Sequence, residues 1–266
     1  MVEGQLIGSP VRLAYQSFGQ LEGMARYQAR LAELVKGTAS PGTDVSILRL
    51  PSALVEGKGF ASAQALELPS ILNSIALAIE AGNEAVAIGN GFDPGLWEAR
   101  ELFDVPILGL FETVAFYGLR VGWRLGVLCS GKSGVARVEE MAARYGISSR
   151  MVRPVALGIS VPRIVEGFQN PAVAGEVLAS TQTAVSDLAR QGAEVVIVAS
   201  GALDVFLNTH EAPDANGLPI LQSVQILVSE LESAANLARQ GVPYVSRAGR
   251  FRKPPEAVLD LVRKRP

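Results

Sequence analysis

Two short apolar runs in this chain end in a polar residue followed by glycine, and these polar residues are placed to do chemistry. Asn90 precedes Gly91, and Ser200 precedes Gly201. The amide of Asn90 can hydrogen-bond a carbonyl, a carboxylate or a developing oxyanion while staying uncharged. The hydroxyl of Ser200 can bind a ligand or, beside a base, act as a nucleophile. Each residue also has a simpler role, since asparagine favours turns and serine caps helices.

The chain holds one cysteine, Cys129, and one histidine, His210. A thiol or an imidazole can exchange a proton near neutral pH, so both are candidate catalytic groups. Cys129 lies either in a pocket or in the core as an inert thiol. His210, in the segment 208–217, either covers the site on a lid or is a solvated loop residue. With one cysteine and one histidine, we expect no disulfide, no metal site and no cofactor.

Carboxylates and further hydroxyls near the same runs are candidate substrate contacts. Burial can turn Asp93 or Glu112 into a base or let it orient a neighbour, although Asp93 before a proline can equally shape a turn. Ser130 and Ser133 precede a predicted helix whose free N–H groups attract anions, and capping explains the same residues. The predicted catalytic residues are Asn90, Ser200, Cys129 and His210. The predicted substrate-binding residues are Ser17, Gly91, Asp93, Glu112, Ser130 and Gly201.

Residues 126–133 match the phosphate-loop pattern G-x-x-x-x-G-K-S. In a phosphate loop the first glycine follows the strand, whereas residues 127–129 are themselves of strand type. No later apolar strand ends in the aspartate that would support Mg²⁺. We therefore do not expect this chain to bind a nucleoside triphosphate.

The elements that must position these residues alternate along the chain. Short β-branched runs are separated by longer segments of helical periodicity, which predicts βαβ units around a parallel sheet. The predicted strands are 11–16, 45–50, 85–89, 107–110, 125–129, 152–155, 195–199 and 220–221. The predicted helices are 24–36, 70–81, 135–145, 175–191 and 223–240, and four of them end at a glycine.

An internal repeat relates the two parts of the chain. The matched segments, with their offsets, are 12–19 with 124–131 (112), 82–91 with 192–201 (110) and 106–108 with 219–221 (113). Three ordered matches at nearly one offset indicate a duplicated architecture. Ser17 and Asn90 then correspond to Cys129 and Ser200. Because the carboxyl ends of strands line the crevice of open α/β sheets, we expect these four residues to converge on one pocket.

The repeat predicts the fold class and the domain organisation. We expect an α/β protein of two similar Rossmann-like halves with mainly parallel sheets, related by a pseudo-twofold axis, with a cleft between them. The first half is expected to span 1–118 plus 220–266, and the second 119–219. Because no low-complexity linker separates them, we expect a tight interface and not a flexible tether.

Composition narrows the classes of partner. The 266 residues are 48% hydrophobic and 19% charged, enough apolar residues for a sizeable core. With 24 Lys+Arg against 26 Asp+Glu and no long block of like charge, nucleic acid is not an expected partner. We found neither a signal-peptide pattern nor 18 consecutive apolar residues, so we expect a cytoplasmic protein without a membrane partner. A small-molecule substrate is expected, and a homo-oligomer is compatible with the sequence.

The segment that starts at Asn90 resembles a known family motif. Hydantoin racemases and their relatives carry Cys-x-x-Asp-Pro-Gly-Leu after a strand, then an Ala-Arg-Glu helix, a Val-Pro-Ile/Val-x-Gly strand and a glutamate. This chain carries Asn90-Gly-Phe-Asp-Pro-Gly-Leu, Ala99-Arg-Glu, Val105-Pro-Ile-Leu-Gly and Glu112. The family's second cysteine falls at Ser200. The chain thus resembles the aspartate/glutamate/hydantoin racemase superfamily over most of its length, least in 207–217, with both catalytic cysteine positions substituted.

The resemblance implies a function but not the family's usual mechanism. There, one thiolate removes an acidic α-proton and a second thiol returns a proton on the opposite face, which neither Asn90 nor Ser200 does unaided. The implied activity is an isomerase, decarboxylase or ring-opening enzyme that acts on a small carboxylate or a cyclic ureide such as a hydantoin through an enolate-type intermediate. The proton would then be moved by Cys129, Asp93, Glu112, His210 or water. The alternative is a non-catalytic small-molecule-binding or regulatory protein that keeps the racemase cleft.

Overall fold

The computed structural model describes residues 9–18, 23–50, 60–210 and 217–263. Its strands form two sheets, and every strand pair is parallel. The first sheet has the order β2-β1-β3-β4 and consists of β1 (Arg12–Phe18), β2 (Asp44–Leu50), β3 (Ala85–Ile88) and β4 (Ile107–Gly109). The second has the order β6-β5-β7 and consists of β5 (Leu125–Cys129), β6 (Val155–Ala156) and β7 (Val195–Val198). The expected α/β class with parallel sheets is confirmed.

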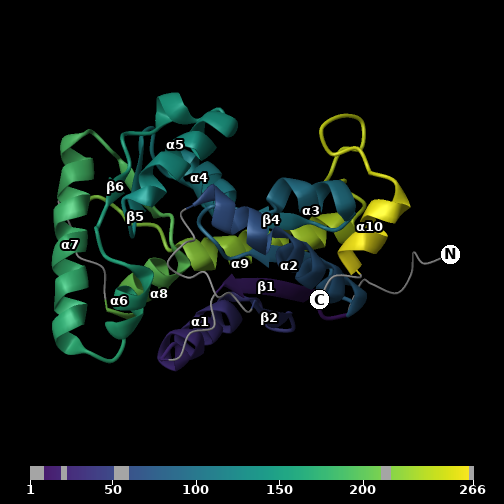
Figure 1. Ribbon diagram of the computed structural model, residues 1–266, viewed down its shortest axis with the longest axis horizontal. Coiled ribbons are helices and arrows are strands. Elements are labelled where there is room, and N and C mark those ends of the chain that lie inside the picture. The colour runs from purple at the N-terminus through teal and green to yellow at the C-terminus, as the bar shows by residue number, and fades with distance from the viewer. Residues whose placement is uncertain (1–8, 19–22, 51–59, 211–216, 264–266) are drawn as a thin grey trace.

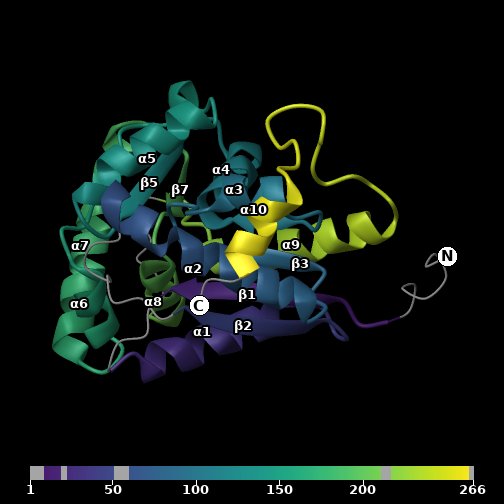
Figure 2. The ribbon, with the colours of Figure 1, turned by 45° about the vertical axis from the view of Figure 1, so that its right-hand side comes forward.

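Helices surround both sheets (Figure 1). They are α1 (Ala25–Thr38), α2 (Ala61–Glu80), α3 (Leu96–Leu102), α4 (Leu110–Val121), α5 (Ser133–Arg144), α6 (Val161–Glu166), α7 (Pro171–Arg190), α8 (Gly201–Thr209), α9 (Ser223–Arg239) and α10 (Glu256–Arg263), with a short 3₁₀ turn at Ser148–Arg150. Helix α7 packs against β5 and β6 of the second sheet and has α6 beside it, whereas α10 packs on α2 beside the first sheet (Figure 2). Helix α9 runs between the two and contacts α1, α4 and β3.

The two sheets place the matched segments of the sequence at equivalent positions. Strands β1 and β5 are both central, β2 and β6 flank them on one side, and β3 and β7 flank them on the other. The counterpart of β4 is reduced to a single parallel bridge between Val196 and Ile220. The repeat seen in the sequence therefore extends to the order and direction of the strands.

Apolar packing joins the two sheets into one core. All residues of β3 and β7 are buried, as expected for parallel strands that are covered by helices on both faces. Helix α9 contributes Val224, Leu227, Val228 and Leu231, whose helical spacing forms a fully buried stripe. One apolar cluster contains this stripe together with residues of both sheets. Burying each such side chain contributes about 1.5–3 kcal/mol, which favours a fixed arrangement of the halves.

The ends of β3 and β7 meet at two glycines. A Cβ atom added to Gly91 would clash with the backbone carbonyl group of Ala199. One added to Gly201 would lie 3.3 Å from the carbonyl oxygen of Gly89. Because Gly89 and Gly91 correspond to Ala199 and Gly201 in the repeat, these contacts are reciprocal. The two chain segments approach each other this closely because neither glycine carries a side chain.

Some elements differ from those predicted. The strand expected at 152–155 is shifted to β6, and the one expected at 220–221 is only the bridge at Ile220. Helix α2 begins well before residue 70 and accommodates Pro69, which normally ends a helix. Helices α4, α6, α8 and α10 were not predicted, since they are short or follow a strand directly, whereas α3 was expected from the Ala-Arg-Glu motif. The proposed division into 1–118 plus 220–266 and 119–219 stays a prediction.

We predict that Gly91→Ala destabilises the protein by about 1–3 kcal/mol, because the added methyl group must displace the backbone at Ala199. Gly131→Ala is the matched control, since an added Cβ there meets nothing within 4 Å. Urea unfolding followed by circular dichroism measures both variants. Equal free energies of unfolding for the two variants would show that the strand ends are not in close contact.

Candidate functional site

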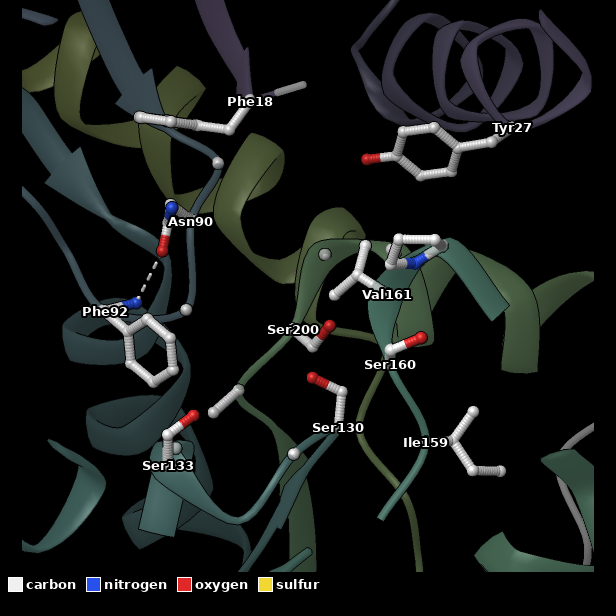
Figure 3. A pocket seen from close by; sticks show the side chains of 18 of the residues that line it. Phe18, Tyr27, Asn90, Phe92, Ser130, Ser133, Ile159, Ser160, Val161 and Ser200 are labelled. Atoms are coloured by element: carbon white, nitrogen blue, oxygen red, sulfur yellow. Dashed lines mark hydrogen bonds between the residues drawn. The ribbon is translucent and has the colours of Figure 1, made fainter. Parts of the chain in front are cut away.

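A cavity of about 400 Å³ opens where the carboxyl ends of β3, β5 and β7 meet (Figure 3). Side chains from both sequence repeats line it. Phe18, Tyr27 and Asn90 come from the first, and Ser130, Ser160 and Ser200 from the second. Of the predicted site residues, the structure places five along this cavity: Asn90, Gly91, Ser130, Ser200 and Gly201.

Asn90 follows β3 and is held in a turn. Its side-chain oxygen accepts a hydrogen bond of 3.0 Å from the backbone N–H of Phe92. Its amide nitrogen points the other way, toward Phe18, which also lines the cavity (Figure 3). An amide nitrogen is only a hydrogen-bond donor, so this residue presents a donor to a ligand. Both roles weighed for Asn90, turn former and ligand contact, are thus compatible in one geometry.

Serine hydroxyls form the opposite side of the cavity. Ser200 caps α8 by accepting from the N–H of Leu203 at 3.4 Å, and Ser160 caps α6 in the same way through Arg163. The hydroxyls of Ser130 and Ser200 point toward the same part of the cavity (Figure 3). A hydroxyl both donates and accepts, so this side can match C=O and N–H groups of one ligand.

Three helices begin at the cavity. Ser133 and Gly134 of α5, Val161 of α6 and Gly201 of α8 all line it. The first turn of a helix has N–H groups without helical partners and the positive end of the helix dipole. The described lining residues include no Asp, Glu, Lys, Arg or His. Peptide dipoles therefore contribute partial positive charge to the cavity, which suits a ligand on which negative charge develops.

Among the described lining residues, which include no cysteine, Tyr27 carries the one titratable side chain. Burial raises its pKa to about 12, a hydrogen bond with Ser17 opposes the rise, and Asp204 adds to it. The phenol therefore stays protonated at neutral pH. The described walls of the cavity offer hydrogen-bond donors but no group that gains or loses a proton near pH 7.

Asp93 and Asp204 make equivalent hydrogen bonds to the start of a helix, one in each half of the molecule. Asp93 accepts hydrogen bonds of 2.8 Å from the N–H groups of Phe111 and Glu112 at the start of α4. Asp204 accepts from Ser223 and Val224 at the start of α9, at 2.7 and 2.9 Å. Both carboxylates thus cap a helix and complement its dipole.

Asp93 lies outside the main cavity, in contrast to its expected position near the cleft. Its backbone is left-handed, with φ 44°, and this turn directs the carboxylate toward α4. The hydroxyl of Tyr145 donates to it at 2.9 Å. Burial raises the pKa of Asp93 to about 7, while its hydrogen bonds oppose the rise. The residue joins the turn after β3 to α4 and to the end of α5.

Glu112 is also placed away from the main cavity. Arg100 donates to it at 2.8 Å and to the carbonyl of Ile107 at 3.1 Å. The hydroxyl of Tyr244 lies 3.1 Å from the same carbonyl. This network ties α3 to β4 and to the chain after α9. Glu112 is engaged as an ion-pair partner, and not as a free base.

Cys129 ends β5 with its side chain in the core. It is 1% exposed, and a Cβ added to Gly134 would lie 3.5 Å from its sulfur, so Gly134 covers it. Burial raises its thiol pKa to about 12, with a smaller contribution from Glu139. Of the two positions considered for this thiol, the structure places it in the core, under the wall of the cavity.

Ser17 and His210 are likewise absent from the described cavity lining. Ser17 is buried and hydrogen-bonds with Tyr27. His210 follows α8 and packs against Phe206 with ring centroids 4.3 Å apart, and burial lowers its pKa. Residues 211–216, part of the expected lid, lie outside the described residues.

Sequence reasoning did not identify Phe18, Tyr27 and Ser160 as cavity residues. Ser160 carried a usable signal, because a serine two residues before Pro162 is typical of a helix start. Phe18 and Tyr27 have ordinary core patterns, so only the tertiary structure brings them to the cavity. The described residues contain no cluster of three or more His, Cys, Asp or Glu that could hold a metal ion. No described helix is long and apolar enough to cross a membrane.

Fold and cavity together define an α/β protein with a small-molecule cleft at the junction of two similar parallel sheets. The family model described as Asp/Glu/Hydantoin racemase matches residues 22–231. The chain belongs to the Asp/Glu/hydantoin racemase family. A hydantoin racemase from Pseudomonas sp. (strain NS671) is 23% identical over 177 residues, covering 66% of this chain and 68% of the relative.

Solved structures agree in fold. The allantoin racemase from Klebsiella pneumoniae has a TM-score of 0.75 at 18% identity, with 92% of this chain and 94% of that chain covered. The allantoin racemase from Pseudomonas fluorescens has a TM-score of 0.70 at 22% identity, with 92% and 97% covered. At such identities these likenesses show a shared fold alone.

We predict that Cys129 is inert in the folded protein, because a thiol that is buried and has a pKa of about 12 is hardly ever a thiolate at pH 8. Reaction with a chromogenic disulfide reagent should be at least about a hundredfold slower in buffer than in concentrated urea. Equal rates in the two solutions would place the thiol at an accessible surface.

We predict that Asp204 makes stability fall as pH rises. Burial raises its pKa to about 6, so its uncharged form is favoured in the fold. This contribution is complete below the unfolded-state pKa of about 4 and is lost as pH rises through about 6, on the order of 2 kcal/mol. Asp204→Asn should flatten the free energy of unfolding between these pH values. Asp187→Asn, at a half-buried position on α7 where the carboxylate pairs with Arg190, is the control, and identical slopes for both variants would refute the assignment.

Proposed function

We propose that this chain acts on a small, uncharged cyclic ureide of the hydantoin type, which it binds in the main cavity and converts through an enolate-type intermediate. The observation that carries the proposal is a cavity rich in hydrogen-bond donors and helix N-termini whose described lining has no charged side chain. A ureide presents alternating C=O and N–H groups, which hydroxyls and amides can match. Aspartate and glutamate carry an ammonium group that finds no carboxylate in the described lining, and a malonate carries two full negative charges that no Lys or Arg of this lining offsets.

The same donors support an enolate-type intermediate. When a carbon next to a carbonyl loses its proton, negative charge develops on the oxygen. Peptide N–H groups at helix starts and the amide of Asn90 stabilise such charge without reorganising. In the absence of a neutral-range base among the described lining residues, water accepts the proton. The reaction is then slow and does not follow the two-thiol route.

A second candidate function is ligand binding without chemistry. It is favoured by the same lack of a group with a pKa near 7 among the described lining residues. In this role the protein keeps the racemase cleft as a sensor or carrier of a ureide. The two candidates share the ligand and differ only in turnover.

We infer that the two halves are related by a pseudo-twofold axis that passes between Asn90 and Ser200. The reciprocal contacts of Gly91 and Gly201 support this relation. A ligand between these positions is approached from opposite sides, as two-base chemistry would require. A cytoplasmic location, a homo-oligomer, the lack of a cofactor, and isomerase, decarboxylase or ring-opening chemistry all remain predictions.

We predict that hydantoin or allantoin binds and that aspartate, glutamate and phenylmalonate do not. Isothermal titration calorimetry measures binding, and proton NMR in deuterium oxide measures exchange of the α-proton. Faster exchange with protein than without it indicates an enzyme, whereas binding without exchange indicates the second candidate. Binding of the dicarboxylates alone would overturn the ligand class.

We predict that Asn90→Cys combined with Ser200→Cys raises the α-proton exchange rate of a bound hydantoin by about 10² or more, because a positioned acid or base contributes 10²–10⁴. Either single variant should exchange the α-proton of only one enantiomer of a 5-substituted hydantoin, whereas inversion of that carbon should need both thiols, one on each face. A double variant that folds and binds the ureide but exchanges no faster would refute the placement of the two residues.

A further inference from the structure

Tyr27 is a cavity residue that the proposed function has not yet used. It lies near the start of α1 and is 5% exposed. Its ring packs edge-on against Phe168, with centroids 6.0 Å apart. Its hydroxyl points into the cavity, toward the space between Asn90 and Ser200 (Figure 3). The ring is fixed by apolar packing, so the polar end has a defined place.

Two observations locate the hydroxyl of Tyr27 more closely. It hydrogen-bonds with the side chain of Ser17, at the end of β1. A Cβ added to Gly201 would lie 4.0 Å from its oxygen, so it also lies beside the start of α8. The hydroxyl therefore lies where the first half of the molecule meets the carboxyl end of β7 in the second half. A ligand that contacts Ser200 would lie within reach of this hydroxyl.

The hydroxyl is suited to donate a hydrogen bond. Because its pKa is raised by burial to about 12, the phenol keeps its proton throughout the neutral range. Ser17 can both accept and donate, so it can hold the phenol oxygen while the phenol proton turns to a ligand. A donor that stays neutral can bind a carbonyl oxygen and then stabilise the charge that develops on it.

We propose that Tyr27, held by Ser17, is the specificity-determining donor that contacts one carbonyl oxygen of the ureide. This inference rests on the proposed function, since it names the group that the ligand must present. The bound ligand must then place a hydrogen-bond-accepting oxygen opposite α1. It also assigns a role to Ser17, which orients Tyr27 behind the wall of the cavity.

The first test uses Tyr27→Phe, which keeps the ring and its contact with Phe168 but removes the hydroxyl. Calorimetry should show about five- to tenfold weaker binding of hydantoin, the usual effect of losing one neutral hydrogen bond. The ¹³C resonance of the contacted, labelled carbonyl in the bound ligand should move upfield in the variant. Tyr117→Phe on α4 is the matched control and should change neither readout, since Tyr117 lines a separate groove beside α9.

The second test needs no variant and works even if Tyr27→Phe does not fold. A sulfur is a weaker hydrogen-bond acceptor than oxygen, so 2-thiohydantoin and 4-thiohydantoin are compared with hydantoin on the wild-type protein. Substitution at the contacted carbonyl should weaken binding, whereas substitution at the other should weaken it less. In a Tyr27→Phe variant that folds, the two thiohydantoins should differ less than in the wild type.

Failure of this inference can be told apart from failure of the proposed function. If wild-type protein binds no ureide, the proposed function itself is wrong. If it binds hydantoin and Tyr27→Phe binds equally well with an unshifted carbonyl resonance, only the role of Tyr27 is overturned. Ser17→Ala should give a smaller loss of affinity than Tyr27→Phe, and a larger loss would make Ser17 the direct contact instead.

Discussion

The close approach of two strand ends is the constraint on which the site depends. Gly91 meets the backbone of Ala199, and Gly201 meets that of Gly89. A side chain at either glycine would separate the sheets and move Asn90 away from Ser200. The apolar stripe of α9 and the shared core hold the halves at this distance. A cavity with walls from both halves therefore depends on two positions that carry no side chain at all.

The electrostatics of the cavity come from the backbone. Helix starts supply partial positive charge, while three carboxylates near the site are engaged elsewhere. Asp93 and Asp204 each cap a helix, and Glu112 pairs with Arg100. Dipoles fixed by a folded chain do not titrate, and the loss of water around them costs less than burial of a free ion. Such a site distinguishes ligands by the pattern of their donors and acceptors more than by net charge.

The sequence predicted the fold class and the convergence of Asn90 and Ser200, because strand periodicity and the repeat both act at the level of the backbone. It could not predict the direction of individual side chains. Cys129 occupies the repeat position that corresponds to Ser17. Whether the side chain of the last residue of such a strand faces the cavity or the core depends on the helix that packs there, which the sequence does not show. Asp93 turns away from the cavity through a left-handed backbone, and its place before Pro94 indicated a turn but not the direction of the side chain. His210 packs on Phe206 one turn earlier, but α8 is too short to be predicted from its apolar pattern.

The burial of Cys129 bears on how this protein tolerates oxidants. Peroxide attacks thiolates, and an accessible catalytic thiol is converted to sulfenic and then to irreversible sulfinic acid. Here the chain's one sulfhydryl lies beneath the cavity wall, and the side chains of Asn90 and Ser200 do not undergo these oxidations. A cleft arranged in this way can keep its binding chemistry under oxidising conditions. An amide and a hydroxyl at these two strand ends thus offer less proton-transfer power than thiols but greater chemical durability.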